Sequence, residues 1–202
     1  MSSLETFSPD ESLRLIRNMI DKTRRDVSDN SIYFLVWGWG AFLGCIGQFI
    51  LKVVFHNPYH YLVWLITFVC AAISAVVGIR QRKREKAQTY IGESMSYVWS
   101  GLGITFFVIS MIFFRIGWQY AFPFFTVLYG LGTFVSGKFL KYQPLIIGGI
   151  ISFILAVFCA WLTYDYQILC AAGALLVSYI IPGHMLRSRY KSEKQLSSYS
   201  DL

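Results

Sequence analysis

Few residues in this 202-residue chain have the types and spacing that catalysis or metal binding needs. His56 and His60 are four residues apart, and two histidines at that spacing bind zinc when the backbone is helical and a third ligand lies near. Pro58 stands between them, and no acid or cysteine close by in the sequence supplies the third ligand. The sequence therefore predicts no metal site.

Motifs for enzymatic chemistry are also absent. The chain has no nucleophile elbow, zinc-protease helix, phosphate-binding loop or dinucleotide-binding loop. None of the 11 acidic residues falls in the middle of an apolar segment, where a charge is costly and usually marks an ion path. We predict that the protein is not an enzyme and has no cofactor, and we disfavour an ion-coupled pump.

The polar and sulfur-containing side chains inside apolar segments have structural explanations. Gln48 follows Gly40 and Gly44 on one helical face, where its amide either bonds across helices or lines a small cavity, and the first is the better hypothesis. The four cysteines, Cys45, Cys70, Cys159 and Cys170, form no C-x-x-C pair, so we expect packing residues and neither disulfides nor a zinc site.

Composition indicates the elements that must position these residues. Hydrophobic residues make up 55% of the chain and charged residues 14%, and the charges cluster between long uncharged stretches. Six segments have the roughly 20 apolar residues that a membrane-spanning helix needs: 31–55, 60–79, 95–114, 118–137, 144–163 and 166–186. The predicted fold is all-α, a polytopic membrane bundle in which short outer loops make three antiparallel hairpins of the six helices.

Basic residues predict the orientation of this bundle. In a six-span arrangement sixteen Lys and Arg fall on one side and two, Lys52 and Arg115, on the other, which predicts cytoplasmic N- and C-termini. The largest cluster of topology-setting residues is Arg80, Arg82, Lys83, Arg84 and Lys86. We therefore interpret the net charge of +7 as the result of basic residues that orient the bundle in the membrane, and nucleic acid is not expected as a partner.

Two predicted cytoplasmic segments flank the transmembrane domain, residues 31–187. Residues 1–30 contain a helix over about 9–27, which opens with Ser8, Pro9 and Glu11 and is amphipathic. That helix packs on its own bundle, lies on anionic lipid headgroups, or docks a cytosolic protein. Residues 188–202, rich in serine, are expected to be disordered.

Small residues at four-residue spacing predict close helix packing, because lipid gives apolar helices no hydrophobic reason to associate. The candidate packing residues are Gly40 and Gly44, then Cys70, Ser74 and Gly78, then Gly132 and Ser136, then Gly148, Ser152, Ala156 and Ala160, and finally Cys170, Ala174 and Ser178. Such faces serve packing within one chain, a homodimer or a partner subunit.

Five stretches of the chain carry a resemblance to known sequences: FLVWGWG (residues 34–40), LYGLGTFVSG (128–137), PLIIGG (144–149), VSYIIPG (177–183) and the leader RNMIDKTR (17–24). Together they resemble an uncharacterised family of small bacterial inner-membrane proteins. The resemblance covers nearly the whole chain and implies the six-span architecture and a bacterial inner-membrane location. It implies no activity and no catalytic or ligand residues.

Two functional hypotheses follow. The first is a non-enzymatic scaffold, sensor or regulatory subunit that acts through packing and a basic cytoplasmic face. The alternative is a small-solute transporter, or the membrane substrate-binding subunit of one, with a cavity lined by Gln48 and by Tyr or Trp side chains for a neutral or aromatic solute. A membrane enzyme is third, and would need a His or acid site at the membrane edge.

Overall fold

The computed structural model describes residues 32–84 and 90–188, which form helices and no strand. The first helix is Ile32–Val54, and its last turn, η1 (Ile50–Val54), is π-helical. The 3₁₀ segment η2 (His60–Leu65) leads into α2 (Ile66–Arg84), and α3 (Tyr90–Ile116) follows. Next come η3 (Trp118–Tyr120), α4 (Ala121–Phe139), α5 (Gln143–Ala160) and α6 (Tyr164–Leu175), which continues through the π-helical η4 (Leu176–Ile180) to Ser188. The predicted all-α class is confirmed.

Turn chemistry explains where the helices stop. Gly117 ends α3 with a φ of +103°, a conformation that favours glycine, and its N–H donates to the Phe113 carbonyl at 2.8 Å. After the first helix the Asn57 side chain accepts a hydrogen bond from the Tyr59 N–H at 2.8 Å and closes a turn. Pro144 lies in the first turn of α5, where its missing N–H costs nothing.

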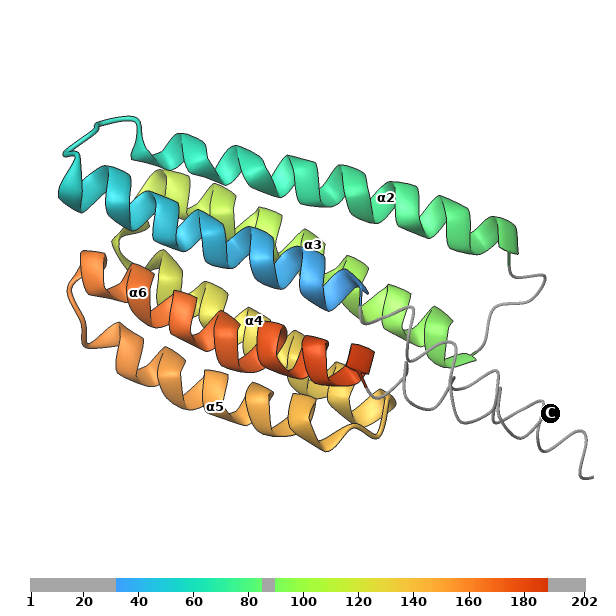
Figure 1. The fold of residues 1–202 in the computed structure, drawn as a ribbon. Helices are drawn as coiled ribbons and strands as arrows, with labels where there is room; N and C mark the ends of the chain where they lie inside the picture. Colours follow the sequence, from blue (N-terminus) through green and yellow to red (C-terminus); the bar gives the residue numbers. More distant parts are fainter. Residues whose placement is uncertain (1–31, 85–89, 189–202) are drawn as a thin grey trace, which may run out of the picture.

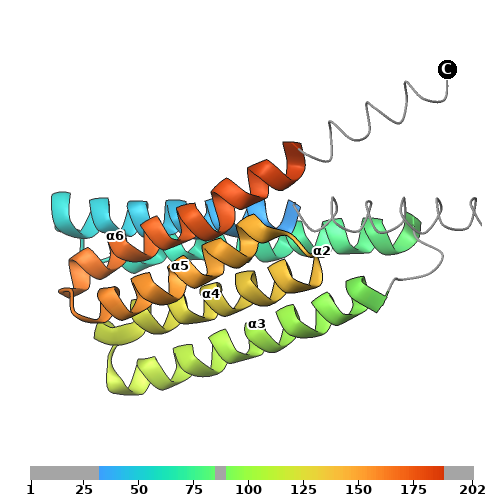
Figure 2. The ribbon, with the colours of Figure 1, turned by 90° about the horizontal axis from the view of Figure 1, so that it is seen from below.

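Five helical stretches of the described residues are long and apolar enough to cross a membrane. They are Ile32–Val54, His60–Arg80, Gly92–Ile116, Gln143–Ala160 and Tyr164–Ser188. The 19-residue α4 is not among them. Its glycines, threonines and Pro123 are buried against neighbouring helices, so fewer of its side chains need to be apolar. Figure 2 shows α4 between α3 and α5.

Helices α4, α5 and α6 pack closely through small residues. A Cβ added to Gly149 of α5 would lie 2.7 Å from the Cβ of Phe134 and 2.8 Å from its backbone nitrogen, both on α4. A Cβ on Gly148, on another face of α5, would lie 3.0 Å from the Cα of Ser178 in η4. Backbones this close require glycine at both positions.

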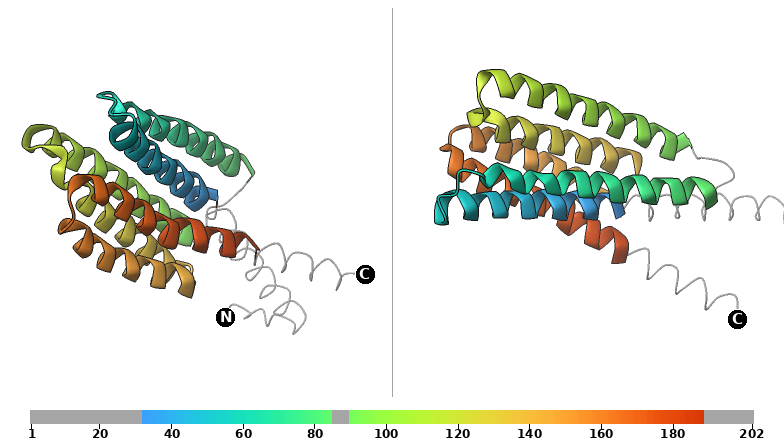
Figure 3. Two further views of the ribbon diagram at one scale, coloured as in Figure 1. Left: turned by 60° about the vertical axis from the view of Figure 1, so that its left-hand side comes forward. Right: turned by 90° about the horizontal axis from the view of Figure 1, so that it is seen from above.

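The first helix connects this group to α2. Its Gly38 approaches Tyr179 of η4, since an added Cβ would lie 2.8 Å from the Tyr179 Cβ. Its Gly40 faces Cys70 of α2, whose Sγ would lie 2.2 Å from an added Cβ. Figure 3 shows the first helix and α2 as a pair, with α3 and α4 on the far side of the bundle.

The axes of the described helices are roughly aligned with one another, and the chain reverses direction at each turn (Figure 1). The C-terminal ends of α2 and α4 and the helical turns that follow η4 up to Ser188 lie at one end of the bundle, whereas the turns around Asn57, Gly117 and Thr163 lie at the other. The predicted amphipathic helix over 9–27, the tail beyond Ser188, and Lys86 lie outside the described residues.

Candidate functional site

A cavity of about 1080 Å³ lies between the first helix and α2 on one side and α3 and α4 on the other. Ligand sites for drug-sized molecules are roughly 300–1,000 Å³, so the space suits a whole small molecule. The cavity extends along the helices: its lining includes Tyr33, Gly78 and Gly92 toward one end of the bundle and His60, Trp118 and Tyr164 toward the other.

The wall of the cavity is mainly aromatic and uncharged. Its aromatic residues come from every helix that lines it except α2: Tyr33, Phe34, Trp37, Tyr61, Trp64, Trp99, Phe106, Phe107, Trp118, Phe122, Phe125, Tyr129 and Tyr164. None of the described lining residues is Asp, Glu, Lys or Arg. Rings also contact one another across helices, as Phe34 does with Trp99 at 5.8 Å between centroids. The cavity therefore favours a neutral, apolar or aromatic molecule.

One side of the cavity is open along α3. Ser100, Gly103 and Phe107 line the cavity and are exposed, with 65% of the Phe107 surface accessible. A Cβ added to Gly103 would meet no atom within 4 Å. This opening lies near the middle of the apolar stretch Gly92–Ile116, where lipid would surround a membrane-spanning helix.

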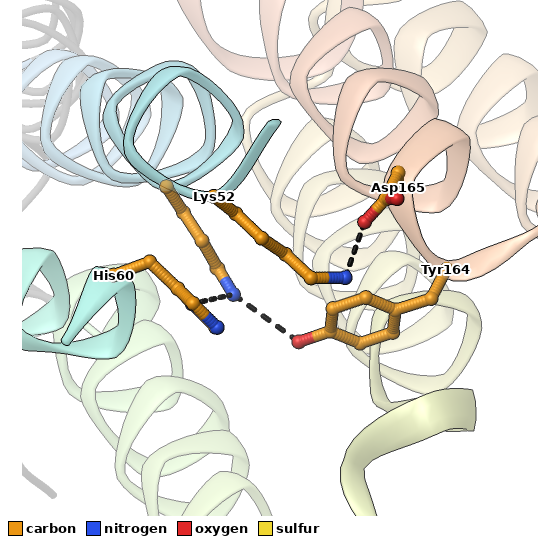
Figure 4. Close-up of polar contacts among 5 residues, drawn as sticks. Lys52, His60, Tyr164 and Asp165 are labelled. Atoms are coloured by element: carbon orange, nitrogen blue, oxygen red, sulfur yellow. Dashed lines mark hydrogen bonds and ion pairs between the residues drawn. The ribbon is translucent and has the colours of Figure 1, made fainter. Parts of the chain in front are cut away.

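A polar cluster centred on Gln48 stands at one end of this apolar space. Figure 4 shows two of its members, His60 and Tyr164, with Lys52 and Asp165 beside them. Gln48 is 2% exposed, and its Oε1 accepts a hydrogen bond from the Trp64 indole N–H at 2.7 Å. Its Nε2 donates to the Tyr164 hydroxyl at 3.1 Å and lies 3.4 Å from His60 Nδ1. The side-chain amide of Gln48 therefore links the first helix to both η2 and α6.

An ion pair borders the cluster. Lys52, in the last turn of the π-helical η1, pairs with Asp165 in the first turn of α6, and its Nζ lies 4.2 Å from the centre of the Tyr164 ring. Each charge also sits at the helix end whose dipole favours it. The two side chains are 30% and 44% exposed, so water screens the pair.

The structure gives Gln48 both of the roles considered for it, because it bonds across helices and also lines the cavity. His56 is exposed with a φ of +49°, while His60 turns toward Gln48. Within the described residues no group of three or more His, Cys, Asp or Glu is placed to hold a metal ion.

Most of the candidate packing residues lie at helix contacts. Gly44 faces the Trp64 ring, Ser74 accepts from Trp37 at 3.1 Å, and Gly78 approaches the Tyr33 hydroxyl. Gly132 faces Leu102, and Cys170 donates to the Leu155 carbonyl. Ser136, Ser152, Ala156, Ala174 and Ser178 are buried, and Cys70 bonds the Val36 carbonyl. Ala160, the last residue of α5, is exposed.

Four of the five residues predicted to set the topology lie at the C-terminal end of α2. Arg80 is exposed, and Arg82, Lys83 and Arg84 belong to the last turn of the helix, whereas Lys86 lies outside the described residues.

Sequence reasoning missed three members of the polar cluster. Aromatic residues make up 18% of the chain, and the sequence around Trp64 and Tyr164 does not distinguish these two from the others. His60 was considered as a metal ligand, whereas the structure makes it a hydrogen-bond partner of Gln48. Only folding brings these residues within reach of Gln48, since Tyr164 is 116 positions away.

Comparisons of the chain with protein-family models, with curated proteins and with solved structures found no match.

Proposed function

We propose that this protein is a bacterial inner-membrane protein with six spans, arranged as three hairpins, and both termini in the cytoplasm. The described basic residues support this orientation. Arg80, Lys138, Lys141 and Arg187 belong to helix ends on one side of the bundle, and Lys52 and Arg115 belong to the other. Retention of Lys and Arg makes the richer side cytoplasmic. The buried α4 completes the six spans.

Within that architecture, its function is to bind a neutral, lipid-soluble aromatic molecule inside the bundle, as a carrier or as the substrate-binding subunit of a transporter. The observation that carries this proposal is the uncharged aromatic cavity of about 1080 Å³. An ionic solute would lose its hydration without gaining a counter-charge from the wall, which is strongly unfavourable. A neutral aromatic molecule loses little hydration and gains contact with the rings.

The opening beside Ser100, Gly103 and Phe107 supports entry from the bilayer. An exposed, apolar rim gives a lipid-soluble molecule a path that avoids water. The transporter or substrate-binding subunit was the alternative of the two hypotheses drawn from the sequence, and the cavity favours it over a purely structural role.

A scaffold or regulatory role stays a second proposal, favoured by the exposed Arg80, Lys138, Lys141 and Arg187 at the cytoplasmic end. Such a basic face suits anionic lipid headgroups or a cytosolic protein. It is also where a partner subunit would dock if the protein binds substrate for a larger transporter.

Filling the cavity from α3 tests ligand binding. The probe is a phenyl(trifluoromethyl)diazirine with a decyl chain, a neutral photolabel, applied to the full chain in lipid nanodiscs. Labelled peptides are identified by mass spectrometry. We expect labels on lining residues such as Phe122 and Trp64, and we expect Gly103→Trp to reduce that labelling by about ten-fold, because the indole occupies open cavity space.

Gly101→Trp is the matched control. Gly101 lies two residues away on the same helix, an added Cβ there also meets nothing within 4 Å, and the residue does not line the cavity. Labelling should therefore stay at the wild-type level. Equal labelling of lining and outward-facing residues in the wild type, or equal loss in both variants, would contradict the proposed function.

A further inference from the structure

Two hydrogen-bond donors near Gln48 have no acceptor among the described residues, and their positions indicate which ligand groups the cavity recognises. An indole N–H only donates, so its partner on Gln48 at 2.7 Å must be the amide oxygen. That fixes the orientation of the amide, whose NH₂ then points toward Tyr164 and His60. Both of these partners must accept.

Acceptance has consequences for each partner. Tyr164 accepts through its hydroxyl oxygen, so the hydroxyl hydrogen is left to donate elsewhere. His60 accepts through Nδ1, so in the neutral ring the proton is on Nε2. Among the described residues neither donor, Tyr164 O–H or His60 Nε2–H, has a hydrogen-bond acceptor, and both residues line the cavity.

Aromatic rings border these two donors on the side of the cavity. The ring of Phe122 lies 5.6 Å from that of Tyr164 and 6.3 Å from that of Trp64, measured between centroids. The aromatic cavity then continues away from the cluster along the helices. Lys52, the nearest cation, is engaged by Asp165 and does not line the cavity.

We propose that the cavity binds a lipid-soluble molecule whose head is a planar ring bearing carbonyl oxygens, such as a quinone. The Tyr164 O–H and His60 Nε2–H donate to a carbonyl oxygen, the rings of Trp64 and Phe122 contact the planar head, and an apolar tail lies along the cavity. A carbonyl oxygen accepts and does not donate, so it matches the two unpaired donors. This inference rests on the proposed function, because it specifies the ligand of the same cavity.

Competition against the diazirine label tests the ligand class. The competitors are 2-decyl-1,4-benzoquinone and decylbenzene, which share the tail and the ring and differ in the carbonyl oxygens, with concentrations counted per lipid. In the wild-type protein the quinone should displace the label at about ten-fold lower concentration, because it makes two hydrogen bonds that decylbenzene lacks. Methyl undecanoate, an ester without a ring, should compete more weakly than the quinone.

Variants at the donors assign the effect to the cluster. Tyr164→Phe keeps the ring and removes the O–H, so the advantage of the quinone over decylbenzene should fall about five-fold. His60→Leu should do the same, and His60→Gln, which retains an amide N–H, should preserve most of the advantage. Tyr166→Phe, an exposed tyrosine two residues along α6 that does not line the cavity, is the control and should change nothing.

The two proposals fail in different ways. Absence of labelling on lining residues refutes ligand binding in the cavity. Labelling of the cavity with equal displacement by quinone and decylbenzene, or an unchanged quinone advantage in Tyr164→Phe, overturns the ligand class alone. Displacement by methyl undecanoate as strong as that by the quinone overturns the planar head. Decylbenzene displacement reports the folded state of each variant within the same experiment.

Discussion

The group formed by α4, α5 and α6 and the group formed by the first helix, η2, α2 and α3 differ in the side chains at their main contacts. In the first group glycines bring backbones into contact, as at Gly149 and Phe134. In the second group large aromatic residues line most of a cavity of about 1080 Å³, and rings from the inner faces of α4 and α6 complete its wall. Lipid provides no hydrophobic force to close helices together, so side-chain size decides whether they touch or stay apart.

Several buried polar side chains of the two groups form different kinds of hydrogen bond. Thr126 and Thr133 of α4 and Ser178 of η4 donate to carbonyls four residues earlier in their own helices. Gln48, in contrast, bonds residues from η2 and α6. Local bonds leave the first group free to pack by shape, whereas the bonds of Gln48 specify which elements meet at the end of the cavity.

The largest expected effect is in the closely packed group. Gly149→Ala should destabilise the protein by about 2–3 kcal/mol, because the new methyl meets the backbone of α4 and the helices must separate. The measurement is the free energy of unfolding from mixed micelles as the fraction of sodium dodecyl sulfate rises.

Gly173→Ala on α6 is the control for that measurement, since a Cβ there meets nothing within 4 Å. It should leave the free energy of unfolding unchanged or raise it slightly, because alanine favours helix. A similar loss of stability in both variants would show that glycine matters through backbone freedom and not through close packing.

An intermediate effect is expected at buried polar side chains. Gln48→Leu should lower the free energy of unfolding by about 1.5 kcal/mol, because it leaves the Trp64 N–H without its acceptor. Ser152→Ala, in the closely packed group, should have almost no effect, since the Ser152 hydroxyl is buried without a hydrogen-bond partner in the described part of the chain. If Ser152→Ala proved the more damaging variant, the contrast between the groups would be wrong.

The smallest effect concerns the ion pair that connects the two groups. A double-mutant cycle of Lys52→Met and Asp165→Asn should give a coupling energy of about 0.5 kcal/mol, because both side chains are partly exposed and water screens them. Raising the salt concentration should reduce the coupling further. A coupling above about 2 kcal/mol would instead show that the pair is shielded from water.

The lengths of the apolar segments and the positions of the helix-breaking residues predict much of the fold from the sequence alone. The six predicted segments correspond to the first helix, η2 with α2, α3, α4, α5 and α6 with its extension, with boundaries differing by up to about five residues at the polar ends. A span in lipid must satisfy its backbone within itself, so its position is a local property of the chain. The small-residue faces are local for the same reason, and Ala160 is the one candidate packing residue that is exposed.

The cavity and its polar cluster were decided by tertiary structure alone. Gln48 could be singled out because it is polar within an apolar segment, but Trp64 and Tyr164 look like other aromatic residues in the chain. Their partnership depends on how the first helix, η2 and α6 cross, at separations of 16 and 116 residues from Gln48. Sequence spacing determines which residues share a helix face, and it contains no information on which faces of different helices enclose a space.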